Sequence, residues 1–261
     1  MRKTALITGA SGGIGLELAR CFARGGFDLV LTARDEIRLH QAADELSARF
    51  KINARIIAKD LSQPQAPHEI WKQLQEDHVH VDVLVNNAGF STYGPFRETD
   101  LEIELQMMQV NIVALTHLSK LFLPAMIERK SGRILNVAST AAFAPGPLMA
   151  VYYASKAFVL SFSRALSNEV EGSGVRVCCL CPGMTTSGFQ ERAGMRDSLM
   201  MEAEMMDAAT VARLGYRGLM RGQSVIIPGR RNRGFALLTR LLPAAKLAQI
   251  IRRAQEKRSE N

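Results

Sequence analysis

Tyr152 and Lys156 are the two residues of this sequence whose types and spacing most directly indicate chemistry. They lie four positions apart in the segment AVYYASKAF, and on a helix this spacing puts both side chains on one face, one turn apart. A phenol with a pKa of about 10 transfers protons poorly at neutral pH, but an ammonium about 6 Å away, at an effective dielectric of about 20, favours the phenolate by roughly 2.8 kcal/mol, or about two pKa units. The pair predicts acid–base catalysis by Tyr152, with the adjacent Tyr153 as the competing phenol.

A glycine-rich stretch, TALITGASGGIG at residues 4–15, is the second candidate site. Its apolar start predicts a buried strand, and Gly9, Gly13 and Gly15 predict a sharp turn into a helix. Such a turn lets the backbone approach a pyrophosphate, which the N–H groups at the helix N-terminus then bind. The spacing is Gly-x-x-x-Gly-x-Gly, so an ordinary strand-to-helix turn is the alternative to a nucleotide site.

Strand and helix patterns alternate along the chain and predict one α/β domain built on a parallel sheet. Apolar runs predict strands over residues 5–7, 27–33, 52–58, 81–85, 133–138, 175–180 and 224–227. Helical periodicity lies over residues 14–24, 35–50, 68–77, 99–129, 151–171 and 207–220. The sequence has no repeat or linker that would divide it.

The charge is concentrated at the C-terminal end. The chain has 33 Lys and Arg against 25 Asp and Glu, but residues 217–261 contain 11 of the basic residues and only two acidic ones. The neutral body offers no basic recognition element, which argues against nucleic acid as a partner. No run of consecutive apolar residues reaches the roughly 18 of a membrane span, so we expect a cytoplasmic protein, or one peripheral to a membrane.

The four cysteines are too few for a disulfide framework in a chain of 261 residues. Cys178 and Cys181 have CxxC spacing, but on a strand they point to opposite faces. We therefore expect a reducing compartment and no metal site.

Other motifs follow in a fixed order: TGASGGIG at residues 8–15, Asp60-Leu61, NNAG at residues 86–89, Asn111, Ser139 thirteen residues before Tyr152, and Pro182-Gly183. With the Tyr152–Lys156 pair, they make the sequence from Lys3 to Gly229 resemble the short-chain dehydrogenase/reductase family, in its single-domain branch. The resemblance implies a doubly wound Rossmann fold with seven parallel strands. It also implies a dinucleotide-binding and catalytic domain over residues 1–234, with a substrate lid at about 184–206.

The resemblance implies hydride transfer between a nicotinamide cofactor and a carbonyl or alcohol, with four catalytic residues. Tyr152 would be the general acid or base, and Lys156 would hold the ribose hydroxyls and lower the pKa of Tyr152. Ser139 would polarise the substrate carbonyl, and Asn111 would position a water that links Lys156 to solvent. The alternatives are a strand-ending serine for Ser139 and a solvent-facing helix residue for Asn111. For the whole chain, the alternative is a catalytically silent NADP-binding sensor or scaffold.

The same resemblance assigns the cofactor contacts. The pyrophosphate and adenosine side comprises Gly9, Ser11, Gly12, Gly13, Ile14, Gly15, Arg34, Asp60, Leu61, Asn87, Ala88 and Gly89. The nicotinamide side comprises Tyr152, Lys156, Pro182, Gly183 and Thr185, with Ser187 in place of the second threonine that is usual in the family. Asp60 could instead be a loop-capping aspartate.

Arg34 decides the cofactor prediction. An acid at the end of the second strand binds the ribose 2′-OH of NAD, whereas an arginine pairs with the 2′-phosphate of NADP. Ala33 stands where the acid is usual in the family, and Arg34 follows it, so the sequence predicts NADP(H). Asp35, one residue later, is the alternative reader of the ribose.

The substrate and the partners are predicted only by class. Half of the 12 methionines lie within residues 184–206, which favours an apolar ketone, aldehyde or alcohol, with Phe90, Phe143, Met149 and Phe189 as further pocket candidates. The alternative is a lid helix whose methionines simply pack on the sheet. We also expect a homo-oligomer, either a dimer or a tetramer.

Residues 235–261 are predicted to be a basic amphipathic extension that Pro243 divides in two. Such a segment can pack on its own domain or on a partner subunit. It can also lie on an anionic membrane surface.

Overall fold

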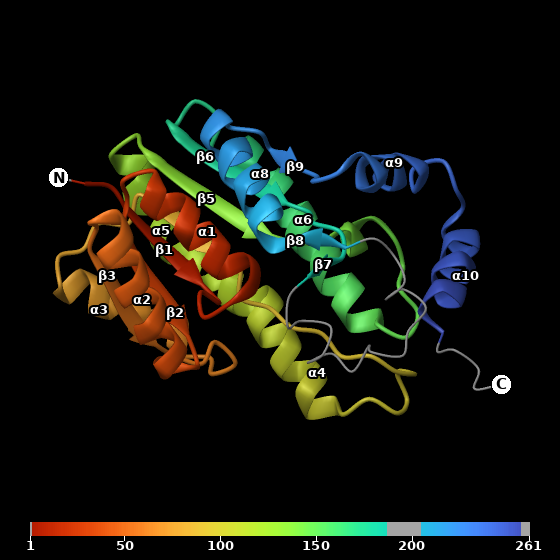
Figure 1. The fold of residues 1–261 in the computed structure, drawn as a ribbon. Coiled ribbons are helices and arrows are strands. Elements are labelled where there is room, and N and C mark those ends of the chain that lie inside the picture. Colours follow the sequence, from red (N-terminus) through yellow and green to blue (C-terminus); the bar gives the residue numbers. More distant parts are fainter. Residues whose placement is uncertain (1, 187–204, 257–261) are drawn as a thin grey trace.

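Seven parallel strands form one sheet in the order β3-β2-β1-β4-β5-β6-β9 in the computed structural model, which describes residues 2–186 and 205–256 (Figure 1). They are β1 (Thr4–Thr8), β2 (Asp28–Ala33), β3 (Ala54–Ala58), β4 (Val83–Asn86), β5 (Gly132–Val137), β6 (Val175–Leu180) and β9 (Val225–Ile226). A short parallel pair, β7 (Thr185–Thr186) and β8 (Met206–Asp207), stands apart from this sheet. The expected doubly wound Rossmann fold is confirmed.

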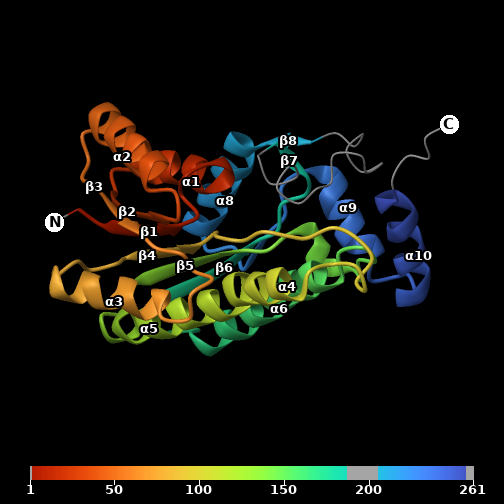
Figure 2. The same cartoon turned by 90° about the horizontal axis from the view of Figure 1, so that it is seen from below.

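Helices cover both faces of the sheet (Figure 2). One layer contains α1 (Gly13–Arg24), α2 (Glu36–Phe50) and α8 (Ala208–Arg221). The other contains α3 (Ala66–Glu76), α4 (Leu101–Met108), α5 (Leu115–Glu128) and α6 (Ala150–Glu169).

Successive side chains of each strand pack on opposite faces of the sheet, into two separate hydrophobic cores. In β1, Ala5 and Ile7 pack with α1, α2 and α8, whereas Leu6 packs with α3 and α5. In β4, Leu84 faces the second core while Val83 and Val85 face the first. Strands buried on both faces read as continuous apolar runs, which is why the sequence indicates them so clearly.

The helical tract expected over residues 99–129 is not one α-helix. A π-helical segment, η1 (Gln109–Ala114), separates α4 from α5. The run Leu101–Glu128 has the length and mean hydropathy of a membrane span. No stretch of consecutive apolar residues within it is long enough to indicate a span. Its side chains Leu118, Phe122 and Met126 are buried against the sheet.

The strand order reverses between β1 and β4, and this is where a doubly wound sheet opens its ligand crevice. The two strand ends are joined by Thr8, whose Oγ accepts hydrogen bonds from the backbone N–H groups of Asn87 and Ala88, both at 2.9 Å. The Asn87 side chain donates back to the Thr8 carbonyl at 2.9 Å. These hydrogen bonds therefore hold the ends of β1 and β4 together at the floor of the crevice.

The C-terminal segment forms two helices, α9 (Arg230–Leu238) and α10 (Ala244–Gln255), and Pro243 directly precedes α10, as expected. They lie at the end of the domain opposite the N-terminus (Figure 2). The predicted division at residues 234 and 235 falls inside α9, and that division remains a prediction. Most of the predicted lid at 184–206, including Ser187 and Phe189, lies outside the described residues.

Candidate active site

Tyr152 lies in the first turn of α6, where its side chain is buried and hydrogen-bonded to the Ser139 side chain. Burial raises the pKa of Tyr152 above its usual value, the Ser139 hydrogen bond lowers it and the neighbouring Tyr153 raises it further. In the protein alone, the nearby Lys156 does not bring this pKa below its usual value. The desolvation of a fully buried phenol outweighs the other contributions, so Tyr152 holds its proton at neutral pH.

Lys156 lies one turn further along α6 and is also buried. Its Nζ donates to the Val137 carbonyl at 3.0 Å and lies 5.8 Å from the centre of the Tyr152 ring. Burial lowers the pKa of Lys156 to about 8. The spacing argument therefore holds, since the two side chains meet on one helix face at the end of β5.

Asn111 is brought to the same place by η1. Its Nδ2 donates to the Phe90 carbonyl at 3.0 Å and to Ser155 Oγ at 3.1 Å, and its Oδ1 accepts from the Phe90 N–H at 3.2 Å. A Cβ at Gly89 would lie 2.9 Å from Asn111 Oδ1 and 3.2 Å from Lys156 Nζ. Asn111 is 1% exposed, so the solvent-facing alternative is wrong.

Ser139 follows β5 and begins a short 3₁₀ turn, η2 (Thr140–Phe143). Its Oγ accepts from the Ala141 N–H at 3.1 Å and donates to the Pro182 carbonyl at 3.4 Å. Ser139 thus caps a turn and also hydrogen-bonds to Tyr152. The two interpretations of Ser139 are compatible.

Tyr153 has a different partner from its neighbour. Its phenol oxygen accepts a hydrogen bond of 2.7 Å from Gln255 Nε2 on α10. Burial raises the pKa of Tyr153 to about 12. Of the two phenols, Tyr152 has the contact with Ser139.

The glycine-rich turn has the shape that a pyrophosphate needs. Gly9 and Gly13 have φ angles of 66° and 55°, and a Cβ at Gly15 would lie 2.2 Å from the Gly9 carbonyl oxygen. By contrast, a Cβ at Gly12 would meet nothing within 4 Å, and no side chain caps the N-terminus of α1 at that residue. The first N–H groups of α1 are therefore accessible to an anion, and the residues present fit a dinucleotide.

Arg34 and Asp60 stand together at the ends of β2 and β3. Arg34 Nη1 lies 3.9 Å from Asp60 Oδ2, and the Arg34 side chain is 67% exposed. Asp60 also accepts from the Ser62 N–H at 2.9 Å, so its loop-capping alternative is observed as well. Asp35, the alternative residue for binding the ribose, caps α2 by accepting a hydrogen bond from the Arg38 N–H at 3.0 Å. Its carboxylate is therefore already engaged in the helix cap.

The remaining cofactor candidates differ in accessibility. Leu61 is buried in the core that contains α3 and α5. Thr185 is buried and donates to the Gly183 carbonyl at 3.0 Å. Gly183 packs against Asn232 of α9, because a Cβ there would lie 2.5 Å from Asn232 Oδ1. Ser11 and Ile14 are half-buried in the glycine-rich turn.

The apolar side chains that were predicted to line the substrate pocket lie in two different clusters. Phe90 and Met149 belong to the buried cluster that contains Tyr152 and Tyr153, whereas Phe143 packs with a cluster on the other side of η2.

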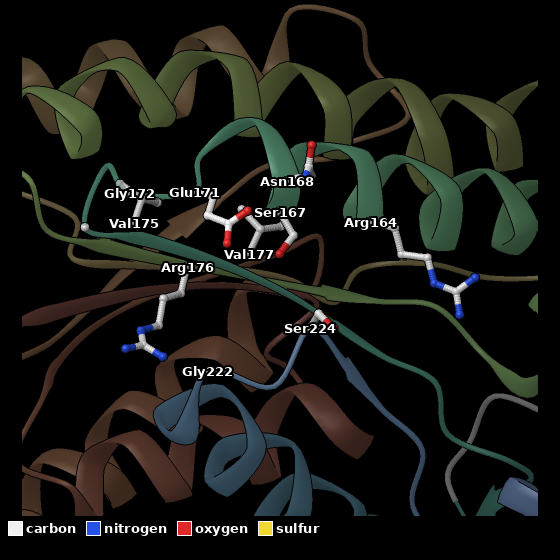
Figure 3. A pocket seen from close by; sticks show the side chains of 11 residues that line it. Arg164, Ser167, Asn168, Glu171, Gly172, Val175, Arg176, Val177, Gly222 and Ser224 are labelled. Atoms are coloured by element: carbon white, nitrogen blue, oxygen red, sulfur yellow. The ribbon is translucent and has the colours of Figure 1, made fainter.

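A cavity of about 610 Å³ lies elsewhere, beside the first residues of β6. Figure 3 shows Arg164 and Asn168 of α6 and Arg176 of β6 around it. These positions are at the amino ends of the strands, far from Tyr152 along the sheet. The cavity is not part of the candidate active site.

The model of the family described as short chain dehydrogenase matches residues 3–197. This chain belongs to the short-chain dehydrogenase family. The family resemblance was correctly predicted from the motifs.

A related chain is the very-long-chain 3-oxoacyl-CoA reductase of Phaeosphaeria nodorum, 35% identical over 82% of this chain and 64% of the relative. Among solved structures, a short-chain dehydrogenase from Sphingobium yanoikuyae in complex with NADPH is 34% identical, with a TM-score of 0.83 over 97% of this chain and 98% of the other. The bulky-bulky ketone specific alcohol dehydrogenase from Comamonas testosteroni is 31% identical, with a TM-score of 0.78 over 92% of each chain. The chain spans about three fifths of the length of the first curated relatives it matches, 60–65%.

Three residues of the site were not predicted. Thr8 braces the crevice, Ser155 accepts from Asn111 and donates to the Tyr152 carbonyl at 2.7 Å, and Gln255 binds Tyr153. The position of Ser155 three residues after Tyr152 was a usable signal, since i and i+3 side chains share a helix face. Gln255 had none, because its partner is 102 residues away.

Proposed function

We propose that this chain is an NADP(H)-dependent reductase of apolar ketones or aldehydes in which Tyr152 transfers the proton. The observation that carries the proposal is that the buried Tyr152 meets Ser139 and Lys156, next to a glycine-rich turn that fits a dinucleotide. Membership of the family and the NADPH complex of the Sphingobium relative support the cofactor. Nothing in the comparisons supports the sensor or scaffold alternative.

The cofactor supplies a hydride from its nicotinamide when it is bound. The N–H groups of the α1 N-terminus would bind the pyrophosphate, and Arg34 would bind the 2′-phosphate. Lys156 would bind the ribose hydroxyls and Thr185 the nicotinamide amide. The other contacts would come from Gly9, Ser11, Gly12, Gly13, Ile14, Gly15, Asp60, Leu61, Asn87, Ala88, Gly89, Pro182 and Gly183.

Tyr152 and Ser139 act on the substrate carbonyl in this mechanism. Ser139 would donate a hydrogen bond that stabilises negative charge developing on the carbonyl oxygen. The raised pKa of Tyr152 keeps its proton in place for donation to that oxygen. Lys156 stabilises the resulting phenolate, and Asn111 would position the water through which the proton is replaced.

An apolar substrate is favoured by the side chains near Tyr152. Met107, Met149 and Tyr153 share its buried cluster, and Phe90 and Tyr93 pack against it. The ketone specificity named for the Comamonas enzyme is consistent with this class.

Tyr152→Phe should lower kcat for ketone reduction by about 10²- to 10⁴-fold, because the variant lacks the proton donor. The dissociation constant for NADPH should change less than threefold, whereas Lys156→Ala should impair both quantities. In wild type, kcat should fall above about pH 8, since burial lowers the pKa of Lys156 to about 8 and the neutral amine no longer stabilises the phenolate, whereas burial keeps the proton on Tyr152 to higher pH. Turnover by Tyr152→Phe at the wild-type rate would mean that another group donates the proton.

Arg34 should give a ten- to hundredfold preference for NADPH over NADH, because a charge-assisted bond to phosphate contributes roughly 1.5–3 kcal/mol. Ala33→Asp combined with Arg34→Gln should reverse it, since the new carboxylate repels the phosphate. The measurement is kcat/KM for both cofactors with one ketone. A wild-type preference for NADH would refute the role of Arg34.

Gly12→Ala and Gly15→Ala form a matched pair that tests the dinucleotide site. Gly15→Ala should lower Tm by about 3–10 °C, because its Cβ meets backbone. Gly12→Ala should leave Tm within about 1 °C yet weaken NADPH binding about tenfold, because its Cβ occupies open space at the N-terminus of α1. Unchanged NADPH affinity in a stable Gly12→Ala protein would argue against this site.

A cytoplasmic homo-oligomer is the assembly that we propose. Apolar side chains are exposed on α4 and α6, including Leu101, Leu105 and Phe158, and a second subunit would cover them. The C-terminal segment also keeps an exposed apolar side, with Leu237 of α9 62% exposed and Leu241, in the turn between α9 and α10, 76% exposed. Together with the surrounding arginines, this side could contact a partner subunit or an anionic membrane.

Equilibrium sedimentation and vesicle pelleting separate these contacts. The protein should sediment as a dimer or tetramer. Leu241→Ser should reduce the fraction of protein that pellets with phosphatidylserine vesicles and leave the fraction that pellets with phosphatidylcholine vesicles unchanged. A strict monomer would contradict the assembly.

A further inference from the structure

Gln255 is the last residue of α10, and it is completely buried although it lies close to the end of the described chain. Its side chain donates to the Tyr153 phenol at 2.7 Å. Its backbone carbonyl accepts a hydrogen bond from the Tyr93 phenol. One glutamine thus connects α10 with α6 and with the loop that follows β4.

Both partners of Gln255 belong to the active-site end of the sheet. Tyr153 is adjacent to Tyr152, and the two rings meet edge to face with centres 6.1 Å apart. Tyr93 lies in the loop after Asn87–Gly89, and the N–H of Gly94 in that loop donates to the Leu148 carbonyl at 2.9 Å. The hydrogen bonds of Gln255 therefore end on the two segments that flank the proposed substrate carbonyl.

The packing of α10 follows the same pattern. Ile251 and Leu247 lie one and two turns before Gln255 on the same helix face, and they are buried in the cluster of Tyr152, Met107 and Met149. On the other face, Gln249 and Ile250 are exposed. The helix thus turns an apolar face toward the catalytic tyrosine.

We propose that α10 forms one wall of the substrate site and that Gln255 is the positioning residue that holds it there. The wall offers aliphatic and aromatic contacts, so it fits a neutral ketone with a bulky apolar substituent. This inference rests on the proposed function and adds to it a specificity element from the C-terminal helix. A buried glutamine whose side chain donates to one phenol and whose backbone carbonyl accepts from another suits this task, because hydrogen bonds are directional and loss of one partner leaves a buried polar group unpaired.

Gln255→Leu tests the wall, and Gln249→Leu makes the same substitution on the exposed face of α10 as a control. The probes are acetone and propiophenone with NADPH. We expect Gln255→Leu to raise KM for propiophenone about tenfold while KM for acetone stays within twofold. For both ketones kcat should stay within threefold, because Tyr152 keeps its own partners, and Gln249→Leu should match wild type.

Tyr153→Phe keeps the proposal testable if Gln255→Leu does not fold. It removes only the hydroxyl that accepts from Gln255, so it should reproduce the roughly tenfold fall in the ratio of kcat/KM for propiophenone to kcat/KM for acetone. The double variant should be no worse than either single variant, because both remove one interaction. A ratio within twofold of wild type, a ratio that rises, or an equal loss of kcat for both ketones would overturn the proposal.

Failure of the proposed function can be distinguished from failure of this inference. If wild type reduces neither ketone, the proposed function is at fault, and amide hydrogen exchange then tests the position of α10. Exchange in Ala244–Gln255 should rise at least tenfold in Gln255→Leu and stay unchanged in Gln249→Leu. Equal exchange in both variants would show that Gln255 does not hold the helix.

Discussion

The burial of the Lys156 ammonium is the constraint on which the active site depends. Its Nζ donates to a backbone carbonyl, that of Val137, and burial lowers its pKa to about 8. A positive charge kept in such a place costs stability, so its position must come from the surrounding fold. Gly89 leaves room for the Lys156 amine, and β5 supplies the carbonyl. The charge then lies where a phenolate and ribose hydroxyls would need it.

The same constraint explains the break in the long helix. A regular α-helix over residues 99–129 would place Asn111 at a different angle, and the π-helical segment turns it toward the Phe90 backbone and Ser155. Such segments are frequent at functional sites. Asn111 thereby fixes the loop next to Gly89 and indirectly the space around Lys156.

Local signals predicted the strands, the helix with Tyr152 and Lys156, and the glycine-rich turn, because each depends on residues a few positions apart. The π-helical segment could not be predicted, since its sequence is ordinary and its geometry comes from contacts with Phe90 and Ser155. The role of Gln255 could not be predicted for the same reason, because it depends on a contact with a residue distant in the sequence. Spacing indicates a nearby charge but not how completely both groups lose water, so it could not predict that burial raises the pKa of Tyr152 in the protein alone.

Transfer of deuterium from NADPH labelled at C4 of the nicotinamide tests the central claim most directly. Wild type should place the label on the carbonyl carbon of a ketone such as propiophenone, from one C4 position only, because a fixed site presents one face of the ring to the substrate. Unlabelled alcohol from both C4-labelled epimers, or no alcohol with any ketone or aldehyde tested, would contradict the account.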